Sequence, residues 1–265
     1  MEKQMNTAVK TAAEKKADSF SVMLTDKLNA LGQALPKEVN KTRFVNNALS
    51  LLNSKPELAK ANKNQLMLCL CKGALLGLDF MSGECYAIPY GEKVNFQTDY
   101  KGEIKLAMRY GKKNIKSIVS DVVKEGDKFN VDIVDNEPKI NFEKIPFNDK
   151  EIVGVFAYVV YEDNSCDYVT LSKTEVNTIR GNYSKAQNST AWKNSWDEMA
   201  KKTAIRRLCK RIIIDFENAE QVMAWEEGSD FQVKQQRQRD EREVPNIFEQ
   251  PNVVEAEVVD AEESK

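Results

Sequence analysis

Histidine does not occur anywhere in this 265-residue sequence. Its absence removes the commonest general base and the commonest metal ligand of proteins. Five cysteines are present without a Cys-x-x-Cys pair, which argues against a zinc site. Because their number is odd and no secretory signal precedes them, we expect reduced thiols in a cytosol. The cysteines are Cys69, Cys71, Cys85, Cys166 and Cys209.

Other patterns that carry chemistry are also missing. There is no Gly-x-x-x-x-Gly-Lys-Ser/Thr loop, so nucleotide hydrolysis is not expected to drive the function. The longest apolar run, Leu66 to Leu78, is interrupted by Lys72 and is too short to cross a bilayer, so we expect no membrane contact. Acidic residues fall mostly on expected turns and caps. The sequence therefore predicts a non-enzyme without metal or cofactor, and disfavours a metal-dependent nuclease.

Charge is divided unevenly along the chain. Residues 240–265 hold nine acidic and two basic residues, which leaves 37 basic and 32 acidic residues in 1–239. A basic body suits a polyanionic partner. The acidic tail either competes with that partner for the basic surface or serves as a separate contact site. We predict a disordered or helix-extending segment at 1–19, a core at 20–228 and a flexible acidic tail at 229–265. Within the tail, residues 245–260 fit a small folded tip, a partner-binding peptide or, as we favour, a linker.

The stretch from Trp192 to Arg211 has seven Lys or Arg residues, two Trp and no Gly or Pro, which predicts one long helix. Its apolar residues fall on one side at helical spacing. Cations beside flat rings suit a phosphate backbone with unstacked bases. The alternative is that both tryptophans pack under a neighbouring element while the cations are only solvated. The candidate residues on the opposite face are Trp192, Trp196, Lys202, Arg206, Arg207 and Lys210.

A second basic ridge is predicted on a helix between Asp99, as its cap, and Gly111, as the residue that follows its end. Taken alone, such a ridge is more often a solubilising face, but two ridges favour a groove. Glu103 falls within the apolar arc of this helix and Lys201 within that of the other. We therefore hypothesise that these two residues pair. The cations of the second ridge are Lys101, Lys105, Arg109 and Lys112.

The remaining pattern predicts an α+β fold. Amphipathic or apolar helices are expected near residues 20–35, 42–52 and 64–78, and a final helix over 219–227. A hairpin with Gly91 in its turn should join Cys85–Pro89 to Lys93–Gln97. Ser172 and Glu175 form a capping box before a short helix. An antiparallel meander is expected from strands at 115–123, 129–134, 139–143, 152–161 and 165–171.

Three stretches together resemble the RecT family of phage single-strand annealing proteins, which is related to Redβ. The first is LGLDFMSGECYAIPYGEKVNFQTDYKG at 76–102, and the second is EMAKKTAIRRLCK at 198–210. ALPKEVNKTRFVNNAL at 34–49 matches more loosely. Asp79-Phe80 stands where a family proline often follows Leu-Gly-Leu, a departure that should not disturb the fold. The similarity covers roughly residues 20–225.

This resemblance implies an antiparallel sheet and a long helix that form a groove. It implies ATP-independent binding of single-stranded DNA and its annealing into duplex in phage-type recombination, by homo-oligomeric rings or helical filaments in the host cytoplasm. It also implies a phage-type exonuclease partner and a contact with host single-strand-binding protein. The rival interpretation is a protein that only protects single strands, or a scaffold that recruits an exonuclease. The resemblance places Asn95, Gln97, Tyr100 and Lys101 at the groove, with Arg109 and Lys112 on the ridge. The second family block contributes Lys202, Arg206, Arg207 and Lys210.

Overall fold

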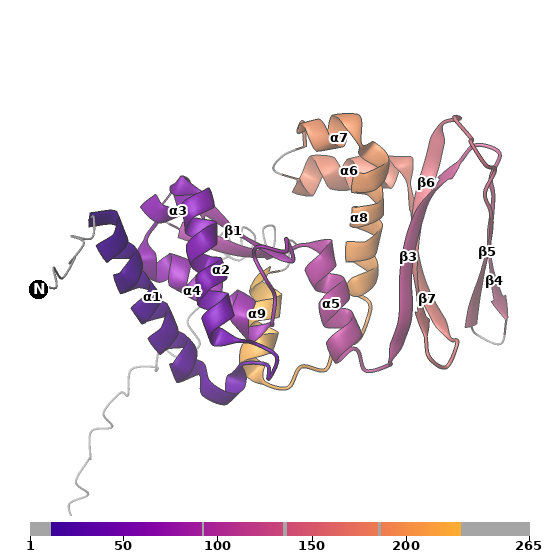
Figure 1. The fold of residues 1–265 in the computed structure, drawn as a ribbon. Helices are drawn as coiled ribbons and strands as arrows, with labels where there is room; N and C mark the ends of the chain where they lie inside the picture. The colour runs from indigo at the N-terminus through magenta and orange to yellow at the C-terminus, as the bar shows by residue number, and fades with distance from the viewer. Residues whose placement is uncertain (1–11, 92, 135–136, 185–186, 229–265) are drawn as a thin grey trace, which may run out of the picture. The chain divides into compact units, whose positions relative to one another are not determined.

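The computed structural model describes residues 12–91, 93–134, 137–184 and 187–228 (Figure 1). The predicted acidic tail at 229–265 and the first eleven residues lie outside this part of the chain. Helix α1 (Ala12–Leu31) begins within the stretch for which we expected either disorder or a helical extension. The α+β class is confirmed, since helices alternate with antiparallel strand pairs in small sheets.

The helices of the amino-terminal region begin at residues that can cap them. A short 3-10 helix, η1 (Gly32–Ala34), follows α1. Asn40 accepts a hydrogen bond from the Arg43 amide at 2.9 Å at the start of α2 (Lys41–Ser54). Asn62 caps α4 (Lys63–Leu75) in the same way. The helices predicted at 42–52 and 64–78 are confirmed as α2 and α4. The short α3 (Pro56–Lys60) was not predicted.

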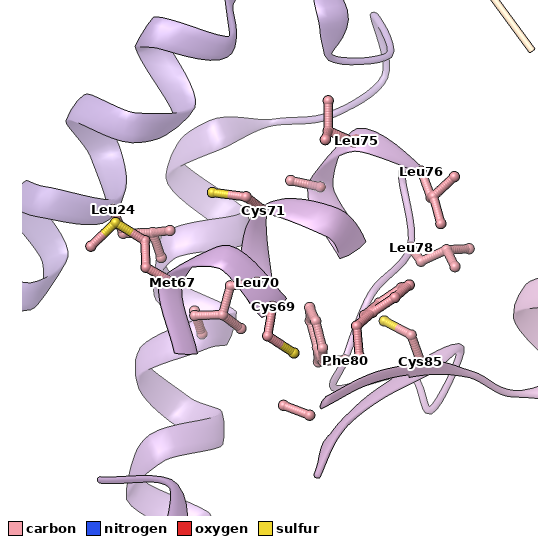
Figure 2. Close-up of a cluster of buried hydrophobic side chains, with 14 of the residues drawn as sticks. Leu24, Met67, Cys69, Leu70, Cys71, Leu75, Leu76, Leu78, Phe80 and Cys85 are labelled. Carbon is pink, nitrogen blue, oxygen red and sulfur yellow. The ribbon is translucent and has the colours of Figure 1, made fainter. Parts of the chain in front are cut away.

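A first hydrophobic cluster lies where α4 packs against the neighbouring helices and the following hairpin. Leu24 of α1, Leu70 of α4 and Leu78 in the connection to the hairpin are almost completely buried (Figure 2). Phe80 and Cys85 lie on the hairpin side of this cluster. The nearly continuous apolar sequence of α4 is therefore explained by contacts on most of its faces.

The predicted hairpin is present as β1 (Cys85–Tyr90) and β2 (Lys93–Thr98). Gly91 has φ +59° in the turn, a conformation that favours glycine. Helix α5 (Tyr100–Tyr110) follows directly. Gly111 follows the helix end as predicted, with a φ of −59° and a ψ of 131° rather than the left-handed conformation, and it bridges to Ile214. A Cβ at Gly111 would lie 2.5 Å from the Ala107 carbonyl oxygen, so close backbone approach explains this glycine.

The five predicted strands do not form one meander. Strands β3 (Ile115–Lys124), β6 (Ile152–Tyr161) and β7 (Cys166–Ser172) pair in the order β3-β6-β7. The hairpin of β4 (Lys128–Val134) and β5 (Glu137–Glu143) forms its own sheet. The centres of the Phe129 and Phe142 rings lie 4.8 and 4.9 Å from that of the Phe156 ring, in a tilted and an edge-to-face arrangement. Aromatic packing between the two sheets therefore takes the place of strand pairing.

The predicted helix from Trp192 to Arg211 is interrupted. Ser195 ends α7 (Thr190–Asn194) and precedes α8 (Trp196–Cys209), with a non-helical φ of −141° and ψ of 52°. Asn and Ser side chains compete for backbone hydrogen bonds, which makes Asn194-Ser195 a weak point for a helix. The capping box of α6 (Lys173–Tyr183) is confirmed, and α9 (Ala219–Gly228) matches the predicted final helix.

A second hydrophobic cluster forms between α8 and the three-stranded sheet. Ala204 and Leu208 of α8 are fully buried together with Ala157 and Val159 of β6. Phe156 points to the opposite face, where β4 and β5 cover the sheet. Helix α5 contributes to both clusters, since Leu106 belongs to the first and Ala107 to the second. In the described part of the chain, no helix has the length and apolarity required to span a membrane.

Candidate nucleic-acid interface

The outward face of the β1–β2 hairpin carries polar and aromatic side chains. The antiparallel register places Tyr86 opposite Gln97 and Ile88 opposite Asn95. Their neighbours along each strand point into the first cluster, so these four share the other face. Asn95 and Gln97, both predicted from the sequence, therefore lie beside Tyr86, whose residue surface is 36% exposed. Tyr86 was not predicted, because the strand sequence CYAIPY shows no alternation of polar and apolar residues that would indicate its outward face.

Cations lie beside aromatic rings where the hairpin, α5 and α8 meet. The Lys202 ammonium is 5.4 Å from the centre of the Tyr100 ring, which links α8 to the first turn of α5. The Lys55 ammonium is 5.9 Å from the centre of the Tyr86 ring. Lys101 is exposed next to Tyr100. The predicted combination of cations and rings is thus present here, with tyrosines rather than tryptophans as the aromatic groups.

Asp99 lies within this cationic group. It occupies the position before α5, but its side chain makes no N-cap hydrogen bond, contrary to our prediction. The adjacent Tyr100 amide is its backbone hydrogen-bond partner. Burial raises the pKa of Asp99 above its ordinary value of 3.8, while Lys202, Arg206 and Lys101 oppose that shift. A phosphate that approaches these lysines therefore also meets a half-buried carboxyl group.

Arg206 lies beneath the interface and joins its three elements. Its guanidinium is 3.2 Å from the carboxylate of Glu103, a residue of α5 with no exposed surface. It also donates to the Thr98 carbonyl oxygen at 3.3 Å, at the end of β2. The Thr98 hydroxyl in turn donates to Glu103 at 3.1 Å. Arg206 was predicted on an exposed face, but only 20% of its side chain is exposed.

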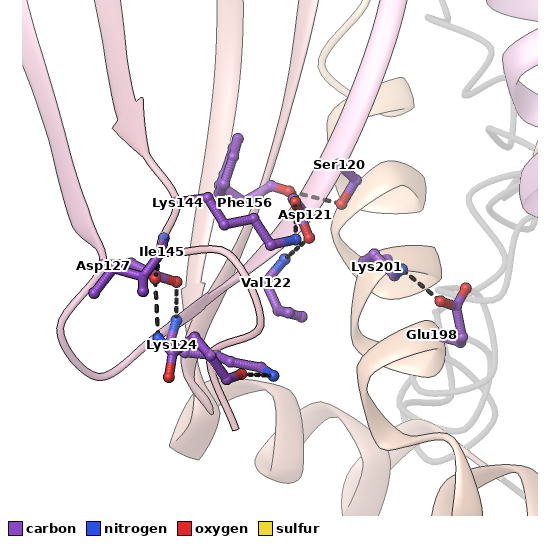
Figure 3. A network of polar contacts seen from close by, with 11 residues as sticks. Ser120, Asp121, Val122, Lys124, Asp127, Lys144, Ile145, Phe156, Glu198 and Lys201 are labelled. Atoms are coloured by element: carbon purple, nitrogen blue, oxygen red, sulfur yellow. Dashed lines mark hydrogen bonds and ion pairs between the residues drawn. The ribbon is translucent and has the colours of Figure 1, made fainter. Parts of the chain in front are cut away.

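The hypothesis that Glu103 pairs with Lys201 is wrong. Lys201 instead pairs with Glu198, three residues earlier on its own helix (Figure 3). Arg206 supplies the partner of Glu103, five residues further along α8. The sequence correctly indicated an ionic link between the two basic helices. Which cation makes it depends on where the helices cross, and helical periodicity does not contain that information.

The remaining cations of the second ridge do not form a continuous charged surface. The Lys105 ammonium is 2.7 Å from the Glu84 carboxylate, which neutralises it. Arg109 is near the other end of α5, 4.0 Å from Glu38. Lys112 is exposed beyond the helix end, so about 14 Å of helix separates Lys101 from the last residue before that end. Only the first-turn end of this ridge meets Tyr100 and Lys202.

Trp192 and Trp196 pack against neighbouring elements, which was the alternative to base stacking in our sequence analysis. Trp192 is 5% exposed within the second hydrophobic cluster, and the Arg180 guanidinium is 5.3 Å from the centre of its ring. Trp196 is partly buried, and its indole N–H donates to the Asn177 side-chain oxygen at 3.0 Å. Both rings therefore pack with α6 and the second hydrophobic cluster.

The last two predicted cations lie elsewhere on α8. The Lys210 ammonium is buried at the end of the helix. Arg207 is exposed and lines a shallow hollow of about 390 Å³ against β7, together with Glu175 and Arg211. The Arg211 guanidinium donates to the Tyr168 carbonyl oxygen at 2.9 Å in the same hollow. Arg207 is thus separated from the hairpin face and belongs to a different surface.

The described thiols and carboxylates do not offer a metal centre. Among residues 12–91, 93–134, 137–184 and 187–228, no three Cys, Asp or Glu side chains gather as metal ligands would. Burial raises the pKa of Cys69 to about 12 and that of Cys71 to about 11. These thiols are therefore protonated at neutral pH, and they serve as small apolar groups of the core.

Comparison with known proteins gives a consistent match over this region. The RecT family model matches residues 42–245, a range that contains every candidate residue of the interface. The sequence is 30% identical to Protein RecT of Escherichia coli (strain K12) over 217 residues, which is 78% of this chain and 79% of that protein. It is 32% identical to the uncharacterized protein YqaK of Bacillus subtilis (strain 168) over 172 residues, or 64% of this chain and 58% of that protein.

Proposed function

This chain belongs to the RecT family, and we propose from that premise that it binds single-stranded DNA and anneals complementary strands during homologous recombination. The observation that carries the proposal beyond the family match is the Tyr100–Lys202 contact beside the hairpin face. We place the activity in the host cytoplasm and without nucleotide hydrolysis. Assembly into rings or helical filaments, an exonuclease partner and a contact with host single-strand-binding protein complete the proposal, and these rest on the family resemblance.

In the proposed complex, lysines neutralise phosphates and tyrosines support bases. Lys101, Lys202 and Lys55 lie near rings that offer a stacking face, and base stacking on an aromatic side chain contributes about 1–3 kcal/mol per base. Asn95 and Gln97 supply neutral hydrogen-bonding groups on the adjoining hairpin face. Such an arrangement holds a strand through its backbone and is tolerant of base sequence.

Base pairing supplies the free energy of annealing in this proposal. Each stacked step of a duplex contributes about 1.4 kcal/mol, so about ten matched steps give roughly 14 kcal/mol. The protein then acts on the rate, because it keeps the first strand extended while a complement is sampled. This distinguishes annealing from simple protection, in which no second strand is accepted.

The test is a pairing assay with complementary, fluorescently labelled oligonucleotides in the absence of ATP. Wild-type protein should accelerate pairing. A strict ATP requirement, or binding of one strand without uptake of its complement, would contradict the proposal. The second outcome would support the single-strand-protecting alternative.

The surface itself is tested through the salt dependence of binding. Lys101→Ala and Lys202→Ala should each make the slope of log affinity against log salt shallower by about 0.7, the value for one lost contact to a single strand. Lys128→Ala is the matched control, because Lys128 is 81% exposed on β4, away from the hairpin face. Unchanged slopes in both interface variants would remove this surface from the DNA contact.

A further inference from the structure

Strand β7 is an edge of the three-stranded sheet, since the strand order is β3-β6-β7. The Tyr161 amide donates to the Ser165 carbonyl oxygen at 3.0 Å across the turn that joins β6 to β7. Backbone groups alternate in direction along a strand, so every second residue of β6 counted back from Tyr161 faces β7. The register then pairs the backbone of Val169 with β6 and turns the backbone groups of Tyr168 and Thr170 toward the free edge.

Two side-chain contacts agree with this direction. The Ser120 hydroxyl donates from β3 to the Phe156 carbonyl oxygen at 2.6 Å, so Phe156, which lies opposite Thr170 in the register, faces away from β7. The Arg211 guanidinium donates from outside the sheet to the Tyr168 carbonyl oxygen at 2.9 Å. Thr170 is exposed. In the described part of the chain no strand lies beyond β7, so the Thr170 amide and carbonyl oxygen are available to a further strand.

This free edge borders the shallow hollow of about 390 Å³ that Arg207 and Arg211 line. Both arginines are exposed, and within the described chain neither guanidinium forms an ion pair. Glu175 also lines the hollow, but its carboxylate accepts hydrogen bonds from the Ser172 amide at 2.9 Å and the Ser172 hydroxyl at 3.0 Å in the capping box of α6. The hollow therefore combines excess positive charge with open backbone groups.

Other charged residues near this edge are already engaged. The Lys173 ammonium pairs with the Glu151 carboxylate at 3.0 Å. The Asp167 carboxylate, next to Tyr168 on β7, accepts from the Tyr161 hydroxyl at 2.9 Å. The two arginines of the hollow therefore determine which charge a ligand must carry.

A ligand of this hollow has to supply hydrogen-bonding groups as well as negative charge. The Thr170 amide requires an acceptor and its carbonyl oxygen requires a donor, and an extended polypeptide presents both in alternation. A phosphodiester backbone offers no donor, and Glu175 repels it. Alternate side chains of a strand lie on one face, so acidic residues at every second position all turn to the same side. An extended acidic peptide fits these requirements best.

We propose that the edge of β7 binds an extended acidic segment of a partner protein, which adds a strand beside Thr170 and places its carboxylates at Arg207 and Arg211. Backbone pairing then supplies affinity, and the two arginines select for acidic segments. The hollow is separate from the hairpin face, so a partner bound here does not compete with DNA for Tyr100 and Lys202. The inference goes beyond the proposed function and does not depend on annealing.

The experiment measures binding of a fluorescein-labelled peptide of alternating Glu and Val residues to the full-length chain by fluorescence anisotropy. Arg207→Ala and Arg211→Ala should each weaken binding about fivefold, the upper range for a solvent-exposed ion pair, and should leave the affinity for single-stranded DNA unchanged. Lys101→Ala is the matched control, because it removes a cation of the hairpin face: it should weaken DNA binding and leave peptide binding unchanged. A peptide of alternating Lys and Val residues should not bind.

Methylation of the peptide backbone separates strand addition from simple charge attraction. N-methyl groups on the Glu residues block one edge of the extended peptide, and N-methyl groups on the Val residues block the other. One of these two peptides should lose binding and the other should retain it. Equal effects of the two methylations, no binding of the unmodified peptide, or unchanged peptide binding in both arginine variants would overturn the inference.

Two further outcomes would assign the hollow to a different occupant. Reduced DNA affinity with unchanged peptide binding in Arg207→Ala would overturn the inference in favour of a nucleic-acid contact. Tighter peptide binding after deletion of residues 231–265 would overturn a partner protein as the occupant, in favour of the chain's own acidic tail.

Discussion

Glu103 has no exposed surface, so its carboxylate is removed from water on folding. The free energy of that burial depends on the groups that surround the carboxylate. Arg206 supplies the opposite charge, and the Thr98 hydroxyl supplies a further hydrogen bond. A basic residue in a basic helix can therefore be part of the fold rather than of the binding surface. This distinction matters for any mutational test of the interface, because loss of Arg206 affects both.

Arg206→Ala should lower the free energy of unfolding by about 3 kcal/mol, since removal of one partner leaves a buried charge poorly compensated. Arg207→Ala is the control on the same helix, and its exposed side chain predicts a change within about 0.5 kcal/mol. Urea denaturation measures both values. Adding Glu103→Gln to Arg206→Ala should recover part of the loss. Equal stability of the two arginine variants would show that the pair contributes nothing.

Asp99 predicts a pH dependence of DNA binding. Burial raises its folded-state pKa above 3.8, so the protonated form is favoured on folding. Its contribution to stability is thus fully present below pH 3.8 and is lost as the pH rises through the raised value. At neutral pH, Asp99→Asn should bind single-stranded DNA roughly fivefold more tightly, as expected for about 1 kcal/mol of repulsion between a carboxylate and a nearby phosphate.

Fluorescence anisotropy over a titration from pH 7.5 downward checks this expectation. Wild-type binding should strengthen as the pH falls toward the raised pKa of Asp99, and the binding of Asp99→Asn should change less. The same gain in both proteins would assign the pH dependence to another group.

At the level of elements, the junction between the hairpin and α5 depends on a glycine. A Cβ at Gly102 would lie 2.2 Å from the Glu84 carbonyl oxygen, which is backbone and cannot move independently. Gly181 in α6 has only the Gln187 side chain within reach, at 3.9 Å. Gly181 can therefore accept a methyl group, whereas Gly102 cannot do so without displacing backbone.

Gly181→Ala should stabilise the protein by up to about 1 kcal/mol, the usual helix preference for alanine, whereas Gly102→Ala should destabilise it despite the same preference. Thermal unfolding of the two variants provides the comparison. Stabilisation by both substitutions would mean that the hairpin shifts away from α5 at little cost.

Periodicity and turn chemistry predicted the helices near α2, α4, α5 and α9 and the hairpin of β1 and β2, because their signals are local. The break at Ser195 and the separate β4–β5 sheet were not predicted, since both depend on packing with distant residues. At the candidate site, Lys101 and Lys202 were predicted from helical spacing, whereas Gln97 and Tyr100 were predicted from the family resemblance. Tyr86 and Lys55 were missed because their proximity arises only when β1 and the end of α2 meet.

For the whole molecule, the uneven charge predicts separable roles for the body and the tail. Deletion of residues 231–265 should leave binding to single-stranded DNA intact or slightly tighter, because it removes a net negative segment. Recruitment of partner proteins and activity in cells should decrease. A full-length variant with the tail Glu residues changed to Gln is the control that separates charge from peptide recognition. Loss of DNA binding after deletion would place the tail in the core.

Helix α5 belongs to both hydrophobic clusters, through Leu106 and Tyr110 on one side and Ala107 on the other. Neither cluster can open fully without disturbing this helix, so we expect the described body to unfold as one cooperative unit. Backbone amides in the middle of α5 should then exchange with solvent only through global unfolding. A strand bound at Tyr100 and Lys202 would therefore slow hydrogen exchange in both clusters, including in residues far from any nucleotide.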